Sequence, residues 1–257
     1  MEEAVEQVGK VMPEISIKAE TIFHIGNFAV SNSLFLGVIA MILVVLVALL
    51  IRTQIKTVPG RIQGFIELAL DELLTLMDSV LGTRERSLTY LPLIATVFLF
   101  VTLSNWLGLL PLIGPLIVGH VPLLRAPTSD LNFTIGLAII AVLSVNLLGV
   151  AAIGLGKHMG KFFYNPFRHP IMAFVGILEL ISEFVKIISF SFRLFGNIFA
   201  GEVLLVIIAA IVPYWASFVA PLPFLFLEVF VGMIQGFIFA MLTLVFVGMS
   251  TVAHAEH

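Results

Sequence analysis

Five ionisable side chains fall within one long apolar stretch, and they are the residues best able to do chemistry. The stretch runs from Ile171 to Ile211 and contains Glu179, Glu183, Lys186, Arg193 and Glu202. A charged side chain at bilayer depth costs about 2.5–3.5 kcal/mol on insertion scales, and such residues usually mark the route of an ion or a proton. The stretch is therefore a candidate pathway.

Most of these side chains share one face of a predicted helix. On a helical wheel of about 100° per residue, the first four and Asn197 fall within about 40° of one line, whereas Glu202 lies away from it. The pair Glu183 and Lys186 can also neutralise itself, as i,i+3 pairs do. Arg193 has no acidic residue three or four positions away, which favours a functional role.

A second long helix is predicted from Leu222 to Ala253, and it carries Glu228 and Gln235 on one side. An acid on an apolar helix is costly, so Glu228 is a second candidate for the route. Asn197 and Gln235 can line a route or can simply bridge two helices by hydrogen bonds, and both interpretations stay open.

The composition indicates a membrane protein. The chain is 60% hydrophobic and 11% charged, whereas soluble domains carry about 25% charged residues. The net charge of −3 and the absence of a basic patch exclude a typical nucleic-acid binder. With no cysteine, no zinc-like histidine spacing and no phosphate-binding glycine loop, the sequence predicts no cofactor or metal and no enzymatic active site.

The apolar runs predict an all-α fold with about five membrane-crossing helices. Residues 1–33 are predicted to form an outward-facing arm, and residues 34–257 a single membrane-embedded domain. In residues 62–81 the acids recur at helical spacing and the apolar residues take the opposite face. This pattern is typical of an amphipathic helix lying in the membrane plane. The crossing elements are predicted at Leu34–Ile51, Leu88–Leu110, Phe133–Leu155, 171–211 and 222–253.

The stretch 171–211 is too long for an upright span. At 1.5 Å per residue it would measure about 60 Å as a helix, twice the roughly 30 Å of a hydrocarbon core. It must tilt steeply, or break into a hairpin near Gly196 and Asn197.

The basic residues of the loops predict the orientation. Lys and Arg accumulate on the cytoplasmic side of bacterial membrane proteins. Three lie on the side of the N-terminus: Lys10, Lys18 and Arg125. The opposite side collects Arg52, Lys56, Arg61, Arg84, Arg86, Lys157, Lys161 and Arg168. The N-terminus is thus expected outside and the C-terminus in the cytoplasm.

Several segments resemble subunit a of F-type ATP synthases. Ser191–Glu202 reads SFRLFGNIFAGE and is similar to the family signature RLFGN-x-x-AGE. The segments NWLGLLP from Asn105 and PTSDLN from Pro127, and the spacing of Glu228 and Gln235, agree with the same family. The resemblance covers nearly the whole chain.

This resemblance implies a stationary proton channel in a bacterial inner membrane. Its partners would be protons, the lipid bilayer, a ring of c subunits, against which the last two helices lie steeply tilted, and the peripheral-stalk b subunits. By position, Arg193 matches the essential arginine, and Glu228 stands where some members carry histidine. The outer half-channel would use Asn197, Glu202, Glu228 and Gln235, and the cytoplasmic one Glu179, Ser182, Glu183 and Lys186.

Two other classes of function compete with this one. A proton- or ion-coupled secondary transporter would usually show an internal repeat with paired broken helices, and none is visible. A membrane scaffold that transports nothing would explain the apolar spans, but it leaves Arg193, Glu202 and Glu228 without a reason.

Overall fold

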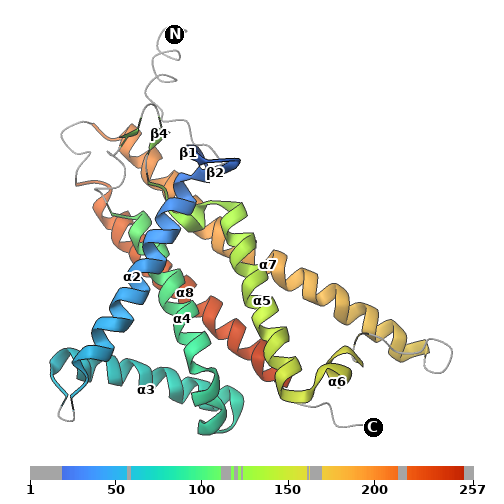
Figure 1. Cartoon of the computed structure of the whole chain (residues 1–257). Helices are drawn as coiled ribbons and strands as arrows, with labels where there is room; N and C mark the ends of the chain where they lie inside the picture. Colours follow the sequence, from blue (N-terminus) through green and yellow to red (C-terminus); the bar gives the residue numbers. More distant parts are fainter. Residues whose placement is uncertain are drawn as a thin grey trace. The chain divides into compact units, whose positions relative to one another are not determined.

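The computed structural model describes residues 19–56, 59–110, 117–118, 121–122, 124–160, 162, 170–213 and 219–251. Within these ranges the chain is almost entirely helical, which confirms the predicted all-α class (Figure 1). The helices are α2 (Asn32–Gln54), α3 (Arg61–Leu81), α4 (Arg84–Gly108), α5 (Leu131–Ile153), α6 (Leu155–Gly160), α7 (Pro170–Ile211) and α8 (Leu222–Thr251).

Four of the described helices are long and apolar enough to cross a membrane by length and composition: α2, α4, α5 and α8. They match the predicted spans to within a few residues. The helix α7 carries the five ionisable residues and is 42 residues long.

The helix α7 is continuous. It starts at Pro170, where a missing N–H costs nothing because the first helical turn has no carbonyl partner for it. It ends just before Pro213, which cannot continue a helix. No turn interrupts it at Gly196 or Asn197, so the hairpin alternative is wrong. The steep tilt in the membrane stays a prediction.

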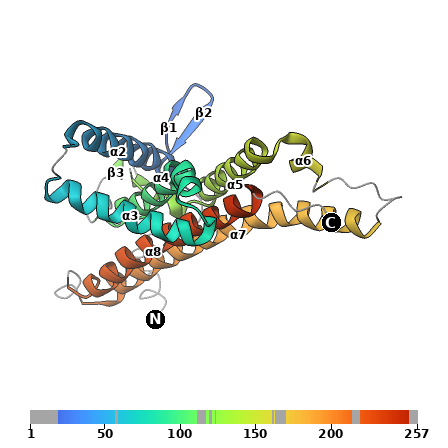
Figure 2. The same cartoon turned by 90° about the horizontal axis from the view of Figure 1, so that it is seen from below.

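Short strands lie in two regions predicted as polar arm or loop. The strands β1 (Thr21–Ile25) and β2 (Phe28–Ser31) pair antiparallel as a hairpin, which is visible beside the start of α2 (Figure 2). Its turn includes Gly26 at φ 63°, a left-handed conformation that glycine adopts without steric cost. The strands β3 (Ile117–Val118) and β4 (Val121–Pro122) pair likewise, and a short 3-10 helix η1 (Pro127–Ser129) precedes α5.

The helix α3 is amphipathic, as predicted. Its buried side chains are Leu74, Met77 and Leu81, while its acids Glu67, Asp71 and Glu72 are exposed. It ends where Gly82, at φ 81°, donates its N–H to the carbonyl of Asp78 at 2.8 Å. This left-handed residue closes the helix end and turns the chain toward α4.

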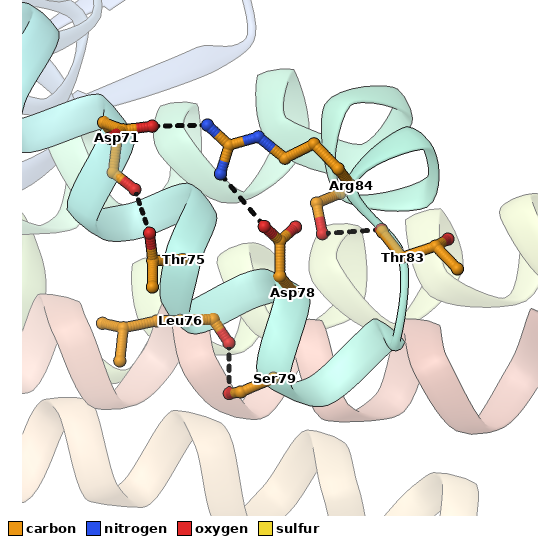
Figure 3. Close-up of polar contacts among 8 residues, drawn as sticks. Asp71, Thr75, Leu76, Asp78, Ser79, Thr83 and Arg84 are labelled. Atoms are coloured by element: carbon orange, nitrogen blue, oxygen red, sulfur yellow. Dashed lines mark hydrogen bonds and ion pairs between the residues drawn. The ribbon is translucent and has the colours of Figure 1, made fainter.

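The corner between α3 and α4 is held by polar contacts (Figure 3). The guanidinium of Arg84 donates to Asp71 and, at 3.0 Å, to Asp78. A hydrogen bond from Ser87, then the hydrogen bond and charge of Arg84, hold the pKa of Asp78 below its usual value. The corner is exposed, so these pairs are expected to fix its geometry more than its stability.

The described residues divide into two compact units, each drawn from three parts of the sequence. The first lies within residues 1–40, 101–134 and 192–235, and the second within 41–100, 135–191 and 236–257. The second unit has an apolar core formed by Met77, Leu81, Ile94, Ala240 and Leu244. The expectation of a single membrane-embedded domain over residues 34–257 stays a prediction.

Candidate functional site

In the first unit, the carboxylate of Glu228 lies against the backbone of α7. Glu228 is only 7% exposed, and a β-carbon added at Gly201 would overlap its carboxyl group. Because glycine has no β-carbon, Gly201 lets the acid of one helix reach the backbone of the other. This close approach places Glu228 beside Glu202, the next residue of α7, near enough for their charges to interact.

Glu202 lies between this acid and a buried arginine. The Nε atom of Arg125 is 3.7 Å from Oε1 of Glu202, and the same Nε donates to the hydroxyl of Ser129 at 3.1 Å. Arg125 is 9% exposed, whereas the side chain of Glu202 is 38% exposed. Arg125 was predicted only as a loop cation, so its pairing with Glu202 is a contact that the sequence reasoning missed.

Each of the two acids keeps one buried oxygen with no hydrogen-bond partner among the described residues: Oε2 of Glu202 and Oε1 of Glu228. Buried polar atoms are nearly always paired with protein or water. These two oxygens are therefore positions at which a proton or a water molecule can be received.

One helical turn away, Asn197 and Gln235 bridge α7 and α8. The Asn197 amide donates to Oε1 of Gln235 at 2.8 Å, and Gln235 is almost fully buried. Arg193 lies four residues before Asn197, at an exposed position of α7, while its neighbour Leu194 is fully buried. The side chain of Arg193 therefore lies on an exposed face of α7.

A buried amide supports the α8 side of this site. The Asn105 side chain donates to the carbonyl of Gly232 at 2.9 Å and accepts from the hydroxyl of Thr128 at 2.7 Å. The indole of Trp106 donates to the carbonyl of Val229 at 2.9 Å. Together these bonds hold the first half of α8 on the end of α4.

Replacing Asn105 by leucine should destabilise this support. Leucine keeps the volume but leaves the Thr128 hydroxyl and the Gly232 carbonyl without their partner, at a cost of about 1–3 kcal/mol. The expected result is a lower midpoint of thermal unfolding of the detergent-solubilised complex and less subunit in the membrane. Thr89→Ala is the control, since that exposed hydroxyl bonds only within its own helix. Equal midpoints for both variants would contradict the supporting role.

The second unit contains a cavity of about 390 Å³, and all four residues predicted for the cytoplasmic side line it: Glu179, Ser182, Glu183 and Lys186. Phe246, Met249 and Ser250 of α8 form part of its wall. Lys186 donates to Oε1 of Glu183 at 2.7 Å, and its ammonium lies 4.6 Å from the ring centre of Phe246. The structure thus brings the four residues together, and their role in proton passage stays a prediction.

Two further residues join this group. The Asn146 amide donates to Oε2 of Glu183 at 3.1 Å, and its oxygen lies 3.0 Å from Nε2 of His158. His158 belongs to the short helix α6 and is 1% exposed. The signal available in the sequence was Asn146, an amide within the predicted span Phe133–Leu155.

The described part of the chain contains no group of three His, Cys, Asp or Glu side chains that could hold a metal ion.

The fold and the site define a class, that of polytopic α-helical membrane proteins with acids and bases along their spans. The family model described as ATP synthase A chain matches residues 34–248. ATP synthase subunit a of Campylobacter fetus subsp. fetus is 33% identical over 247 residues, which cover 96% of this chain and 100% of the relative. The subunit a of Gloeobacter violaceus is 34% identical over 85% of this chain and 83% of its own. The chain belongs to the ATP synthase subunit a family, as the signature around Arg193 indicated.

Proposed function

We propose that this chain, as the proton-translocating subunit of the membrane sector of an F-type ATP synthase, provides two offset half-channels. The outer half-channel uses Glu202 and Glu228 with Asn197 and Gln235. The cytoplasmic half-channel uses the cavity lined by Glu179, Ser182, Glu183 and Lys186. The observation that carries this proposal is the close pair of acids at Gly201, since acids within membrane-embedded helices usually mark the route of an ion or a proton.

Arg193 acts at the boundary between the two half-channels. Its exposed position on α7 suits a residue that faces another subunit, here a rotor carboxylate of the c ring. A fixed positive charge favours the ionised form of that carboxylate, so the proton leaves toward the exit path. The same charge repels a proton that would cross directly from one half-channel to the other.

The outer path works with two carboxylates and needs no imidazole. The resemblance implies that some members of the family carry histidine and others glutamate at the position of Glu228, and here Glu202 and Glu228 are both acids. Arg125 beside Glu202 supplies one positive charge, which offsets one of the two negative charges when both carboxylates are ionised. Proton transfer between carboxyl groups, directly or through one water molecule, is sufficient for this path.

The subunit is not catalytic by itself and needs no cofactor. Its partners are the c ring, the peripheral-stalk b subunits and the lipid bilayer, and its place is the bacterial inner membrane with the N-terminus outside and the C-terminus in the cytoplasm. The membrane potential contributes about 2.3 kcal/mol per 100 mV to the free energy of moving each proton across the membrane.

Co-purification tests this function. We expect the tagged chain to bring down a c-subunit oligomer and a soluble ATPase head from solubilised membranes. A chain that purifies alone and still moves protons in liposomes would instead support the secondary transporter.

The orientation can be tested with single cysteines, because the chain contains none. We choose Ala29 in β2 and Thr83 between α3 and α4, which are both exposed. Gly82 is avoided because its positive φ disfavours a larger residue. An impermeant maleimide should label Ala29→Cys in intact spheroplasts and Thr83→Cys only in inverted vesicles. Labelling of both from one side would contradict the topology.

A further inference from the structure

A chain of polar side chains, buried at His158 and half-buried beyond it, leads from α6 to the cytoplasmic cavity. It runs from His158 through Asn146 to Glu183 and ends at Lys186, with successive distances of 3.0, 3.1 and 2.7 Å. The imidazole also packs on the bare backbone of Gly149, where an added β-carbon would lie 2.7 Å from its Cε1 atom.

The hydrogen-bond partners of Asn146 determine which ring nitrogen of His158 carries a proton. The Asn146 Nδ2 donates to the carbonyl of Val142 at 3.0 Å and to the carboxylate of Glu183. Both of these groups only accept, so the amide cannot be flipped and its oxygen must face His158. Since an amide oxygen only accepts as well, Nε2 of His158 must be the donor.

We propose that His158 is a positioning residue of the cytoplasmic proton path, which, through Asn146, holds the carboxylate of Glu183 toward Lys186 and the cavity. The imidazole fixes the amide, and the fixed amide gives the carboxylate a second donor besides the ammonium of Lys186. This inference rests on the proposed use of the cavity as a proton path. Other charged groups nearby are Glu179, which lines the cavity, and the exposed Lys157.

The test measures passive proton flow in inverted vesicles of the whole complex after the soluble head is stripped off. The cytoplasmic side then faces the buffer, so its pH can be varied while a dye reports the flow. His158→Leu removes the donor, whereas His158→Gln keeps an N–H that can reach the same amide oxygen. His24→Leu is the control, because His24 is an exposed histidine of β1 in the other unit.

We expect His158→Leu to shift the midpoint of the pH profile toward higher pH by about one unit, because losing a donor disfavours the charged carboxylate. His158→Gln should keep the wild-type profile, and Asn146→Leu should reproduce the shift with no further effect of His158→Leu on top of it. Gly149→Ala should shift the profile in the same direction by displacing the ring.

Two results would overturn the proposal. One is an assembled His158→Leu variant with a wild-type profile, and the other is an equal shift for leucine and glutamine, which would point to titration of the imidazole itself. The proposed function is checked separately by Glu183→Gln. If this variant also keeps the wild-type profile, the cavity is not the proton path, whereas a shift in Glu183→Gln alone refutes only the role of His158.

Discussion

An Arg193→Lys variant should insert, assemble and fail to make ATP. Lysine keeps the charge and nearly the length, so a structural role would tolerate it. An ammonium loses its proton more readily than a guanidinium in a poorly solvated place, and it lacks the planar fork that matches a carboxylate. We therefore expect the rate of ATP synthesis to fall by about a hundredfold or more, which corresponds to about 3 kcal/mol of activation free energy.

Arg193→Ala should abolish synthesis as well, and it should add a leak. Without the fixed charge nothing repels a proton between the two half-channels. Stripped vesicles with a pH-sensitive dye under an imposed potential measure this leak, while co-purification of the complex establishes assembly. An assembled lysine variant that synthesises ATP near the wild-type rate would refute the role given to Arg193.

Replacing either acid of the outer pair should reduce proton-driven ATP synthesis by about a hundredfold, within the range that one positioned proton-transfer group contributes. Glutamine keeps the shape of Glu202 or Glu228 but carries no exchangeable acid proton. Because both acids serve one path, the double variant should be scarcely slower than the slower single variant.

The measurement is the rate of ATP synthesis in energised vesicles, with Glu72→Gln as the control, an exposed acid of α3 outside the site. Effects that multiply in the double variant would show two independent routes. Glu228→His tests whether any titratable group suffices, and Gly201→Ala should impair synthesis because the added methyl group overlaps the carboxylate of Glu228.

The helices could be predicted from the sequence because their signals are local. Each signal depends on residues that are close together in the sequence. The signals are the apolar run of α2, the helical spacing of acids and leucines in α3, and the prolines Pro170 and Pro213 at the two ends of α7. The hairpin alternative at Gly196 and Asn197 failed because flexible or polar residues in an apolar helix do not by themselves break it.

The site could be predicted only in part. Residues on one helix face, such as Glu179, Glu183 and Lys186, were grouped correctly by periodicity, and the structure places them around one cavity. Arg125 and His158 were missed because their partners Glu202 and Asn146 lie on other elements, and the sequence does not show which elements meet. Periodicity reports which side chains share a face, but it does not report which face meets which.

The hydrogen bonds of Asn105 and Trp106 also determine when the end of α4 and the first half of α8 can pack together during synthesis. Their acceptors, the carbonyls of Gly232 and Val229, lie 127 and 123 positions further along the chain. The ribosome synthesises α8 after α4. The side chains of Asn105 and Trp106 therefore cannot form these bonds until nearly half of the chain has been added after them. A nascent chain stalled after Pro221 would therefore leave the Asn105 amide nitrogen without its acceptor on α8, which is costly in an apolar environment.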